Sequence, residues 1–194
     1  MTKSIDFYFD FISPYSYLAY QKLKALKNFH EIKINYKPIL LGGLHNLGGI
    51  TAPAFNERKL KNMINDCNLV AKKNNILFNW NIKFPINSLY LMRGYLAINE
   101  KFKKKYFELC FNAYWKDNLD ISNEQNLSNI LEEGGIDKKE FLENIDKIKI
   151  KDELKKLTKL AFDQNIFGAP TFVVNNKIFW GQDRLDYALD EFNS

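Results

Sequence analysis

Cysteine and histidine are scarce in this sequence, which has two of each among its 194 residues. Cys67 and Cys110 are far apart and fit neither a metal-binding nor a redox spacing, so we expect small, buried apolar side chains. His30 and His45 form no cluster of candidate ligands. This scarcity argues against a zinc site and against a Cys-x-x-Cys centre.

Long hydrophobic runs are also missing, and none approaches the length needed to span a bilayer. Met1-Thr2-Lys3-Ser4 passes directly into a strand pattern, so we expect no signal peptide, no membrane association and a cytoplasmic protein. The length predicts one domain, or one domain with a sizeable insertion.

The sequence has no excess of acidic residues, and its net charge is +5. Such a balance can indicate nucleic-acid binding. Here, however, the lysines are spread over many helical faces and interleaved with acids, as in Lys151-Asp152-Glu153. The densest basic run, from Lys101 to Lys105, is typical of a solvated helix end. We therefore predict no nucleic-acid partner, although the positive field favours anionic substrates and cofactors.

A strand that runs directly into a helix lies near the amino terminus. Apolar residues alternate with others over residues 5–11, as in a strand with one buried face, and follow helical spacing over residues 15–26. Ser13 is a good N-cap residue, and Pro14 suits the first helical position because its missing N–H would have no partner there. Ser13 is thus predicted at a helix N-terminus beside a strand end.

A helix N-terminus stabilises an anion such as a thiolate, because its N–H groups are unpaired and its dipole end is positive. In a thioredoxin-like fold this position carries Cys-x-x-Cys, but here the residues are Ser13-Pro14-Tyr15-Ser16. The protein is therefore either an inert relative, with Ser13 only a capping serine, or a site that receives a thiol from outside. In the second case the Ser13 hydroxyl would hydrogen-bond a bound thiolate and lower its pKa.

The carboxyl-terminal end has a matching pattern. A short loop enters a strand at Pro170, and an Asn175-Asn176 turn leads to a second strand from Lys177 to Trp180. Thioredoxin-like folds place a cis-proline at this position, facing the helix start; an ordinary trans proline at a strand start is the alternative. Asp183 is either the N-cap of a final helix or a carboxylate that pairs with a ligand ammonium group.

The middle of the chain separates these two ends. Residues 32–40 alternate as a strand, which predicts a right-handed parallel crossover, and the glycine-rich residues 41–53 predict a long loop. Helical periodicity then dominates as far as residue 165. We predict an α/β fold, with a thioredoxin-like core of residues 1–45 plus 165–194 and a large all-helical insertion of residues 46–164.

Taken together, these segments resemble the 2-hydroxychromene-2-carboxylate isomerases and the related kappa-class glutathione transferases. The resemblance covers nearly the whole chain and rests on the order of several segments: Ser13 to Ala19, Pro85 to Ser88 with Arg93, Ala113 to Trp115 before Asp120 to Ser122, Gly168 to Phe172, and Trp180 to Leu185. It implies a core of the type found in disulfide oxidoreductase A and kappa glutathione transferases.

The resemblance implies glutathione as the cofactor, lying across the top of the core. It assigns glutathione contacts to Ser13, Pro14, Tyr15, Lys59, Ala169, Pro170, Gln182 and Asp183. Ser13 would activate the sulfur, the backbone of Ala169 before a cis-proline would pair with the cysteinyl unit, and Gln182 and Asp183 would hold the γ-glutamyl end. Lys59 would contact glutathione or an anionic substrate; an exposed helix lysine is the default alternative.

One position departs from the family. Ile50 stands where the family commonly has an asparagine that contacts glutathione. Either this loop binds glutathione through its backbone alone, or a shifted alignment hides the contact.

The resemblance implies a homodimeric, glutathione-dependent isomerase of the 2-hydroxychromene-2-carboxylate type in aromatic catabolism. Its substrate would be a small aromatic or unsaturated carboxylate, to which the thiolate adds reversibly. Lys59 or Arg93 would steer the carboxylate. Two alternatives stay open: a kappa-like glutathione transferase or peroxidase, and a thioredoxin-fold module that binds a peptide or thiol without turnover. A disulfide oxidoreductase is excluded because Ser13 and Ser16 replace both cysteines.

Overall fold

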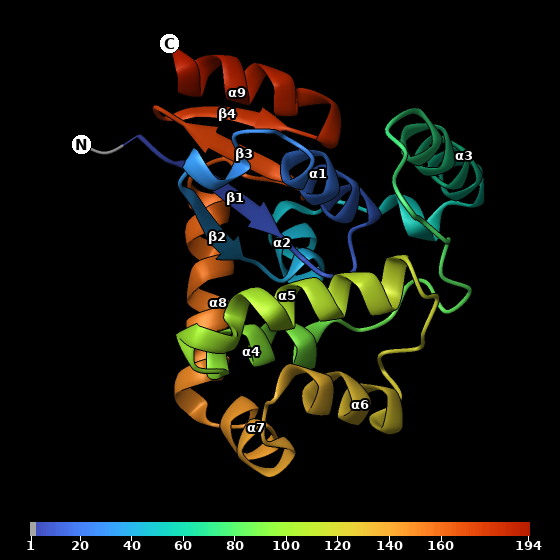
Figure 1. The fold of residues 1–194 in the computed structure, drawn as a ribbon, viewed down its shortest axis with the longest axis vertical. Helices are drawn as coiled ribbons and strands as arrows, with labels where there is room; N and C mark the ends of the chain where they lie inside the picture. Colours follow the sequence, from blue (N-terminus) through green and yellow to red (C-terminus); the bar gives the residue numbers. More distant parts are fainter. Residues whose placement is uncertain (1–2) are drawn as a thin grey trace.

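The computed structural model describes residues 3–194, and in this part of the chain four strands form one sheet in the order β2-β1-β3-β4. The strands are β1 (Ile5–Phe9), β2 (Ile34–Pro38), β3 (Thr171–Val174) and β4 (Lys177–Trp180). β1 pairs with β2 in parallel and with β3 antiparallel, and β3 pairs antiparallel with β4. The two ends of the sequence therefore meet at the centre of one sheet (Figure 1).

The predicted α/β fold is confirmed by the helices that surround the sheet. Helix α1 (Pro14–Lys24) and the 3-10 turn η1 (Phe29–Glu31) connect β1 to β2, and η3 (Gln182–Arg184) and α9 (Leu185–Asn193) follow β4. Between β2 and β3 the chain forms α2 (Leu41–Gly48), η2 (Pro53–Phe55), α3 (Glu57–Lys73), α4 (Leu89–Ala97), α5 (Glu100–Trp115), α6 (Glu124–Gly134), α7 (Lys138–Ile145) and α8 (Ile148–Asp163).

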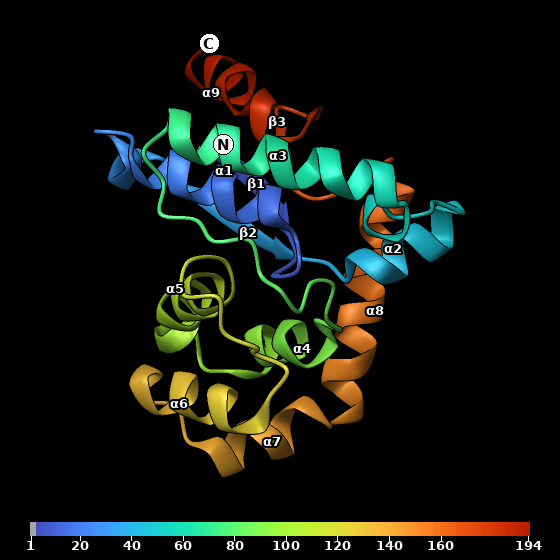
Figure 2. The same ribbon diagram turned by 90° about the vertical axis from the view of Figure 1, so that its right-hand side faces the viewer.

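Helices α4 to α7 lie together below the sheet in Figure 1, and α8 links this group to β2 and α2. Helix α3 stands apart from them and packs against α1, alongside which it runs in Figure 2. The predicted division into residues 1–45 plus 165–194 and residues 46–164 stays a proposal, and its first boundary falls inside α2.

Helices cover both faces of the sheet. On one face Phe9 packs edge-on against Phe107 of α5, with ring centroids 4.8 Å apart. On the other face Tyr8 belongs to a second buried cluster with Leu44 of α2 and Ala161 of α8. The period of two in β1 is thus real, but Tyr8 and Asp10, on the alternate face, are buried as well.

The β1–α1 connection is held in place by the helical group. The indole N–H of Trp115, at the end of α5, donates to the carbonyl oxygen of Phe11 at 2.9 Å. The rings of Phe11 and Phe111 pack edge-on at 5.0 Å. The connection that carries Ser13 is therefore part of the core.

The expected long loop over residues 41–53 is wrong for its first part, which forms α2. Glycines lower helix propensity, but packing overrides it here. Leu44 is buried, and a Cβ built on Gly43 would lie 3.6 Å from the Thr158 methyl group of α8, which indicates close helix contact. Gly49 ends the helix in the left-handed conformation at φ 62°.

The structure contains, within residues 3–194, no helix that is both long and apolar enough to cross a membrane.

Candidate active site

Ser13 is the N-cap of α1, as predicted, and Pro14 occupies the first turn. The Ser13 backbone is extended (φ −84°, ψ 111°), and its Oγ accepts the Ser16 N–H at 3.1 Å. The side chain is almost wholly enclosed, with 3% of its residue surface exposed. A hydroxyl is therefore fixed at the positive end of a helix.

The Ser13 hydroxyl also joins the two ends of the chain. Its Oγ donates to the carbonyl oxygen of Ala169 at 2.9 Å, and the following Ala169–Pro170 peptide bond is cis. The predicted cis-proline opposite the helix start is thus confirmed. Within the described residues the Ala169 N–H makes no hydrogen bond, so one backbone donor beside Ser13 is free for a ligand.

The segment after β4 is tied to the same loop. The Gly181 N–H donates to the Pro170 carbonyl oxygen at 2.9 Å, and Gly181 has φ 110°, which favours glycine. Gln182 follows and is nearly buried, and its carbonyl oxygen accepts from Lys22 Nζ at 3.0 Å. Gln182 and Asp183 therefore directly follow Gly181, the residue that is hydrogen-bonded to the cis-proline.

Asp183 does not cap the final helix, so that prediction is wrong. The residue lies inside η3, and α9 begins at Leu185 without a side-chain cap. Its exposed carboxylate pairs with Arg184 at 3.4 Å. A 3-10 turn inserted between strand and helix moved the helix start two residues beyond the expected cap. The alternative interpretation, a carboxylate for a ligand, stays a prediction.

Tyr15 contacts the middle of α3, whereas Lys59 lies on the first turn of that helix. Tyr15 is partly buried, and its phenol has a pKa raised by burial and then by Cys67 and Asp66 of α3. Lys59 is exposed on the first turn of α3, roughly 10 Å along the axis from Asp66 at 1.5 Å per residue. Among the described residues Lys59 has no ion pair, and its role as a ligand contact stays a prediction.

Ile50 lies just after the left-handed end of α2. Its N–H donates to the His45 carbonyl oxygen at 2.9 Å, and its side chain is 38% exposed. The backbone donor at this position is thus already used to end α2. A backbone N–H donated to glutathione would therefore have to come from a neighbouring residue of this loop.

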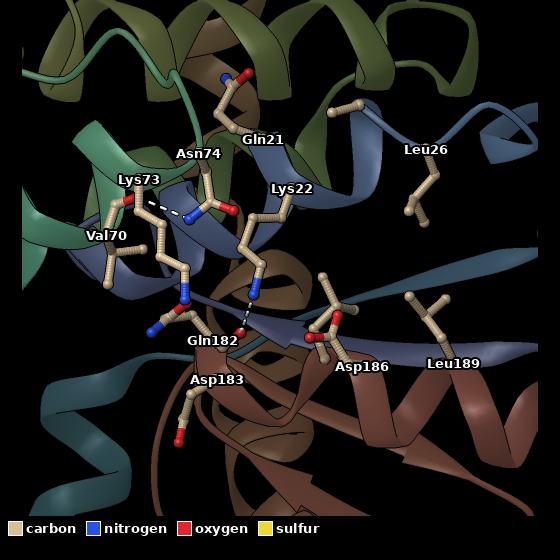
Figure 3. A pocket seen from close by; sticks show the side chains of 12 residues that line it. Gln21, Lys22, Leu26, Val70, Lys73, Asn74, Gln182, Asp183, Asp186 and Leu189 are labelled. Atoms are coloured by element: carbon tan, nitrogen blue, oxygen red, sulfur yellow. Dashed lines mark hydrogen bonds between the residues drawn. The ribbon is translucent and has the colours of Figure 1, made fainter.

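A pocket of about 430 Å³ lies between the end of α1, the end of α3 and the segment from Gln182 into α9. Gln182 and Asp183 line it, but Ser13 does not. Figure 3 shows Lys22 and Lys73 extending from opposite walls towards Gln182. Its α1 wall begins at Gln21, roughly 12 Å along the helix from Ser13, so this hollow reaches Gln182 and Asp183 but does not enclose the hydroxyl.

Asp10 is a feature that sequence reasoning missed. Its side chain is 0% exposed, and its two carboxylate oxygens accept the N–H groups of Ile12 at 3.1 Å and Leu41 at 2.8 Å. Burial raises the pKa of this carboxyl to about 6, while hydrogen bonds from Leu41, Ser88 and Ile12 lower it. The period of two assigned Asp10 to a polar face, and nothing local signals that α2 covers that face.

Both cysteines are fully buried, as expected from their isolation in the sequence. Burial raises the pKa of Cys67 to about 12, and it does the same for Cys110. Neither is a thiolate near neutral pH, and neither lies at the start of α1. A thiol at the Ser13 site must therefore come from another molecule.

Comparisons with known proteins agree with this arrangement. The DSBA-like thioredoxin domain family matches residues 4–193. The 2-hydroxychromene-2-carboxylate isomerase of Sphingobium xenophagum is 31% identical over 189 residues, which cover 96% of each chain. Glutathione S-transferase kappa 1 of Homo sapiens is 27% identical over 202 residues, covering 96% of this chain and 89% of the human protein.

Among solved structures, a 2-hydroxychromene-2-carboxylate isomerase superimposes with a TM-score of 0.88 at 26% identity. The match covers 97% of this chain and 94% of that one. The similarity thus extends over the sheet, the helical group and both segments that meet at Ser13.

Proposed function

Because the chain belongs to the DSBA-like thioredoxin domain family, and within it to the family of 2-hydroxychromene-2-carboxylate isomerases, we propose that it is a glutathione-dependent isomerase of that type. Its substrate is a small aromatic or unsaturated carboxylate. The other parts of the implied function, a homodimer, a cytoplasmic location and a place in aromatic catabolism, belong to the same proposal.

The observation that carries the proposal is the enclosed Ser13 hydroxyl between a helix N-terminus and the cis-proline loop. A hydroxyl in this place donates to an anion but performs no thiol-disulfide exchange. The residues fit glutathione in one further respect. Ser13 Oγ–H and the Ala169 carbonyl, both assigned to glutathione by the resemblance, satisfy each other at 2.9 Å, and the Ala169 N–H is free.

When bound, glutathione supplies a thiolate nucleophile whose reversible addition to an electron-poor carbon makes a double bond temporarily single. The chain supplies the environment for that thiolate. The Ser13 hydroxyl, which donates to the Ala169 carbonyl oxygen here, would donate to the sulfur instead, and the N-terminus of α1 would add its positive dipole end. Both would lower the pKa of the bound thiol below the value of about 8.5 for a free one.

Arg93 is the candidate for holding the substrate carboxylate. It lies on α4, and within the described residues its buried Nε has no hydrogen-bond partner. A guanidinium offers planar, paired donors that match a carboxylate. The net charge of +5 favours the approach of such a substrate as well.

A kappa-like glutathione transferase or peroxidase is the second candidate, favoured by the similarity to the human kappa enzyme. It would use the same Ser13-bound thiolate with an electrophile or hydroperoxide as acceptor. Product analysis distinguishes the two: the isomerase leaves glutathione unconsumed, whereas the transferase forms a conjugate and the peroxidase forms oxidised glutathione. A binding module without turnover forms no thiolate near neutral pH.

The testing experiment is a titration of the protein with glutathione across pH, followed by thiolate absorbance in the ultraviolet. We expect a thiolate band well below the pKa of free glutathione, and we expect Ser13→Ala to weaken it. Ser16→Ala is the matched control, because its buried Oγ has no hydrogen-bond partner within the described residues. Absence of a band in the wild type, or an equal loss in both variants, would overturn the proposal.

A further inference from the structure

Asp10 connects two segments that are distant in sequence. Its carbonyl oxygen accepts the Ser13 N–H at 3.0 Å, and its carboxylate accepts the N–H groups of Ile12 and Leu41. Ile12 and Ser13 therefore fold back over Asp10 directly before the helix starts. Leu41 belongs to the other segment, because it is the first residue of α2.

Helix α2 lacks a cap from its own sequence. Leu40 is its N-cap residue and offers no side-chain acceptor, so the N-terminal N–H groups need a partner from elsewhere. The Asp10 carboxylate supplies one at 2.8 Å to Leu41 and places a negative charge at the positive helix end. The far end of α2 leads through Gly49 to Ile50, in the loop that the resemblance places beside glutathione.

A carboxylate is not the choice that maximises stability at this enclosed position. Burial opposes its ionised form, as the raised pKa of about 6 indicates, and no charged side chain compensates it among the causes of that shift. Asparagine has nearly the same shape but only one acceptor oxygen. The feature that aspartate adds is the ability to hold the Ile12 and Leu41 N–H groups at once.

We propose that Asp10 is a positioning residue, which fixes the Ser13 hydroxyl and the start of α2 relative to each other through its two carboxylate oxygens. This inference rests on the proposed function for the role of Ser13. Asp10 touches neither substrate nor cofactor and acts through the backbone that carries Ser13. Removal of the Asp10 carboxylate therefore shifts the Ser13 hydroxyl from its position without removing that hydroxyl.

The first test is Asp10→Asn, with Asp6→Asn as the matched control on β1. Asp6 is partly exposed and pairs with Lys37 at 3.5 Å, away from Ser13. For Asp10→Asn we expect the pKa of the bound glutathione thiol to rise by about one unit. We expect kcat to fall at least roughly tenfold, the scale of a small misplacement, with KM for glutathione nearly unchanged. A loss confined to thermal stability would overturn the inference.

A second pair of variants isolates the bond to α2. Leu41→Pro removes the N–H that Asp10 accepts, yet proline suits the first helical position, and Leu40 already has the extended backbone required before proline. Leu41→Ala removes the same side chain but keeps the N–H. We expect Leu41→Pro to shift the thiol pKa in the direction of Asp10→Asn and Leu41→Ala to leave it unchanged. Equal behaviour of the pair contradicts the inference, and the pair decides even if Asp10→Asn does not fold.

A measurement without glutathione separates this inference from the proposed function. Amide hydrogen exchange at Ile12, Ser13 and Leu41 should be at least roughly tenfold faster in Asp10→Asn, while amides of α9 stay unchanged. If the wild type binds no glutathione but these three amides respond, the proposed function fails and the positioning role stands. Unchanged exchange at all three would overturn the positioning role whatever the wild type binds.

Discussion

The two segments that the resemblance places around glutathione are held very differently. Ser13 is enclosed and bonded to both Ser16 and Ala169, so its position is determined by α1 and by the sheet. Ile50, just after α2, and Lys59, on the first turn of α3, are the two ends of an exposed stretch. The comparison indicates that the fold fixes the group that acts on the sulfur, whereas the outer contacts can vary without disturbing the core.

Substitution at Ser13 should give the largest effect. Ser13→Ala removes one donor from the sulfur, a change that typically costs 10²–10³ in rate, so we expect kcat to fall by about that factor. It also removes the cap of α1, with a loss of about 1 kcal/mol in the free energy of unfolding.

Ser13→Thr separates these two contributions, because threonine keeps both the cap and the hydroxyl. We expect it to recover the free energy of unfolding and most of the rate, measured by chemical denaturation and by steady-state kinetics. If Ser13→Thr recovered stability but no activity, a hydroxyl at this position would not be sufficient for activation of the sulfur. The enclosed segment would then differ from the exposed stretch in burial but not in catalytic role.

The pH dependence of the unfolding free energy should show how much the burial of ionised Asp10 destabilises the enclosed segment. Burial raises the pKa of Asp10 from 3.8 to about 6, so between these values the folded state binds more protons than the unfolded state. The Asp10 contribution to stability is therefore fully present below about pH 4 and is lost as pH rises through 6. Two units correspond to roughly 3 kcal/mol.

Denaturant unfolding of the wild type and of Asp10→Asn from pH 4 to 7 measures this term. We expect the difference in unfolding free energy between the two proteins to change with pH over this window and to level off above it. A difference that is constant with pH would mean that Asp10 titrates alike in the folded and unfolded states.

The sequence predicted the enclosed segment through local signals. Ser13 and Pro14 mark a helix start by their own chemistry, and Asn175 and Asn176 mark a tight turn, where both take positive φ. The sequence could not predict α2 or the burial of Asp10, because both depend on packing between β1 and distant helices. Local chemistry thus predicted the hydroxyl, while tertiary contacts determine what holds it.

Ile50→Asn should sharpen the comparison by restoring the residue that the family commonly has at this position. The Ile50 side chain is 38% exposed, so the change should leave the free energy of unfolding within about 0.5 kcal/mol. One added hydrogen bond contributes about 0.5–1.5 kcal/mol, so we expect glutathione to bind roughly 2- to 10-fold more tightly, with kcat unchanged.

Isothermal titration with glutathione checks this prediction, and Ile50→Gln is the control of similar polarity and greater length. Equal tightening by both variants would point to polarity in general and not to a placed amide. No change in affinity with either variant would mean that another residue of the loop makes the contact with glutathione.

Lys59→Gln should have the smallest effect, because an exposed charge is largely screened by solvent and salt. We expect glutathione to bind about 2- to 3-fold more weakly at low ionic strength, with the difference vanishing in high salt and with stability unchanged. Lys61→Gln, on the same helix but paired with Glu57 at 2.8 Å, is the matched control. A loss at Lys59 that persists in high salt would instead indicate a direct, desolvated contact with the ligand. The exposed stretch would then be as much a part of the binding site as the enclosed one.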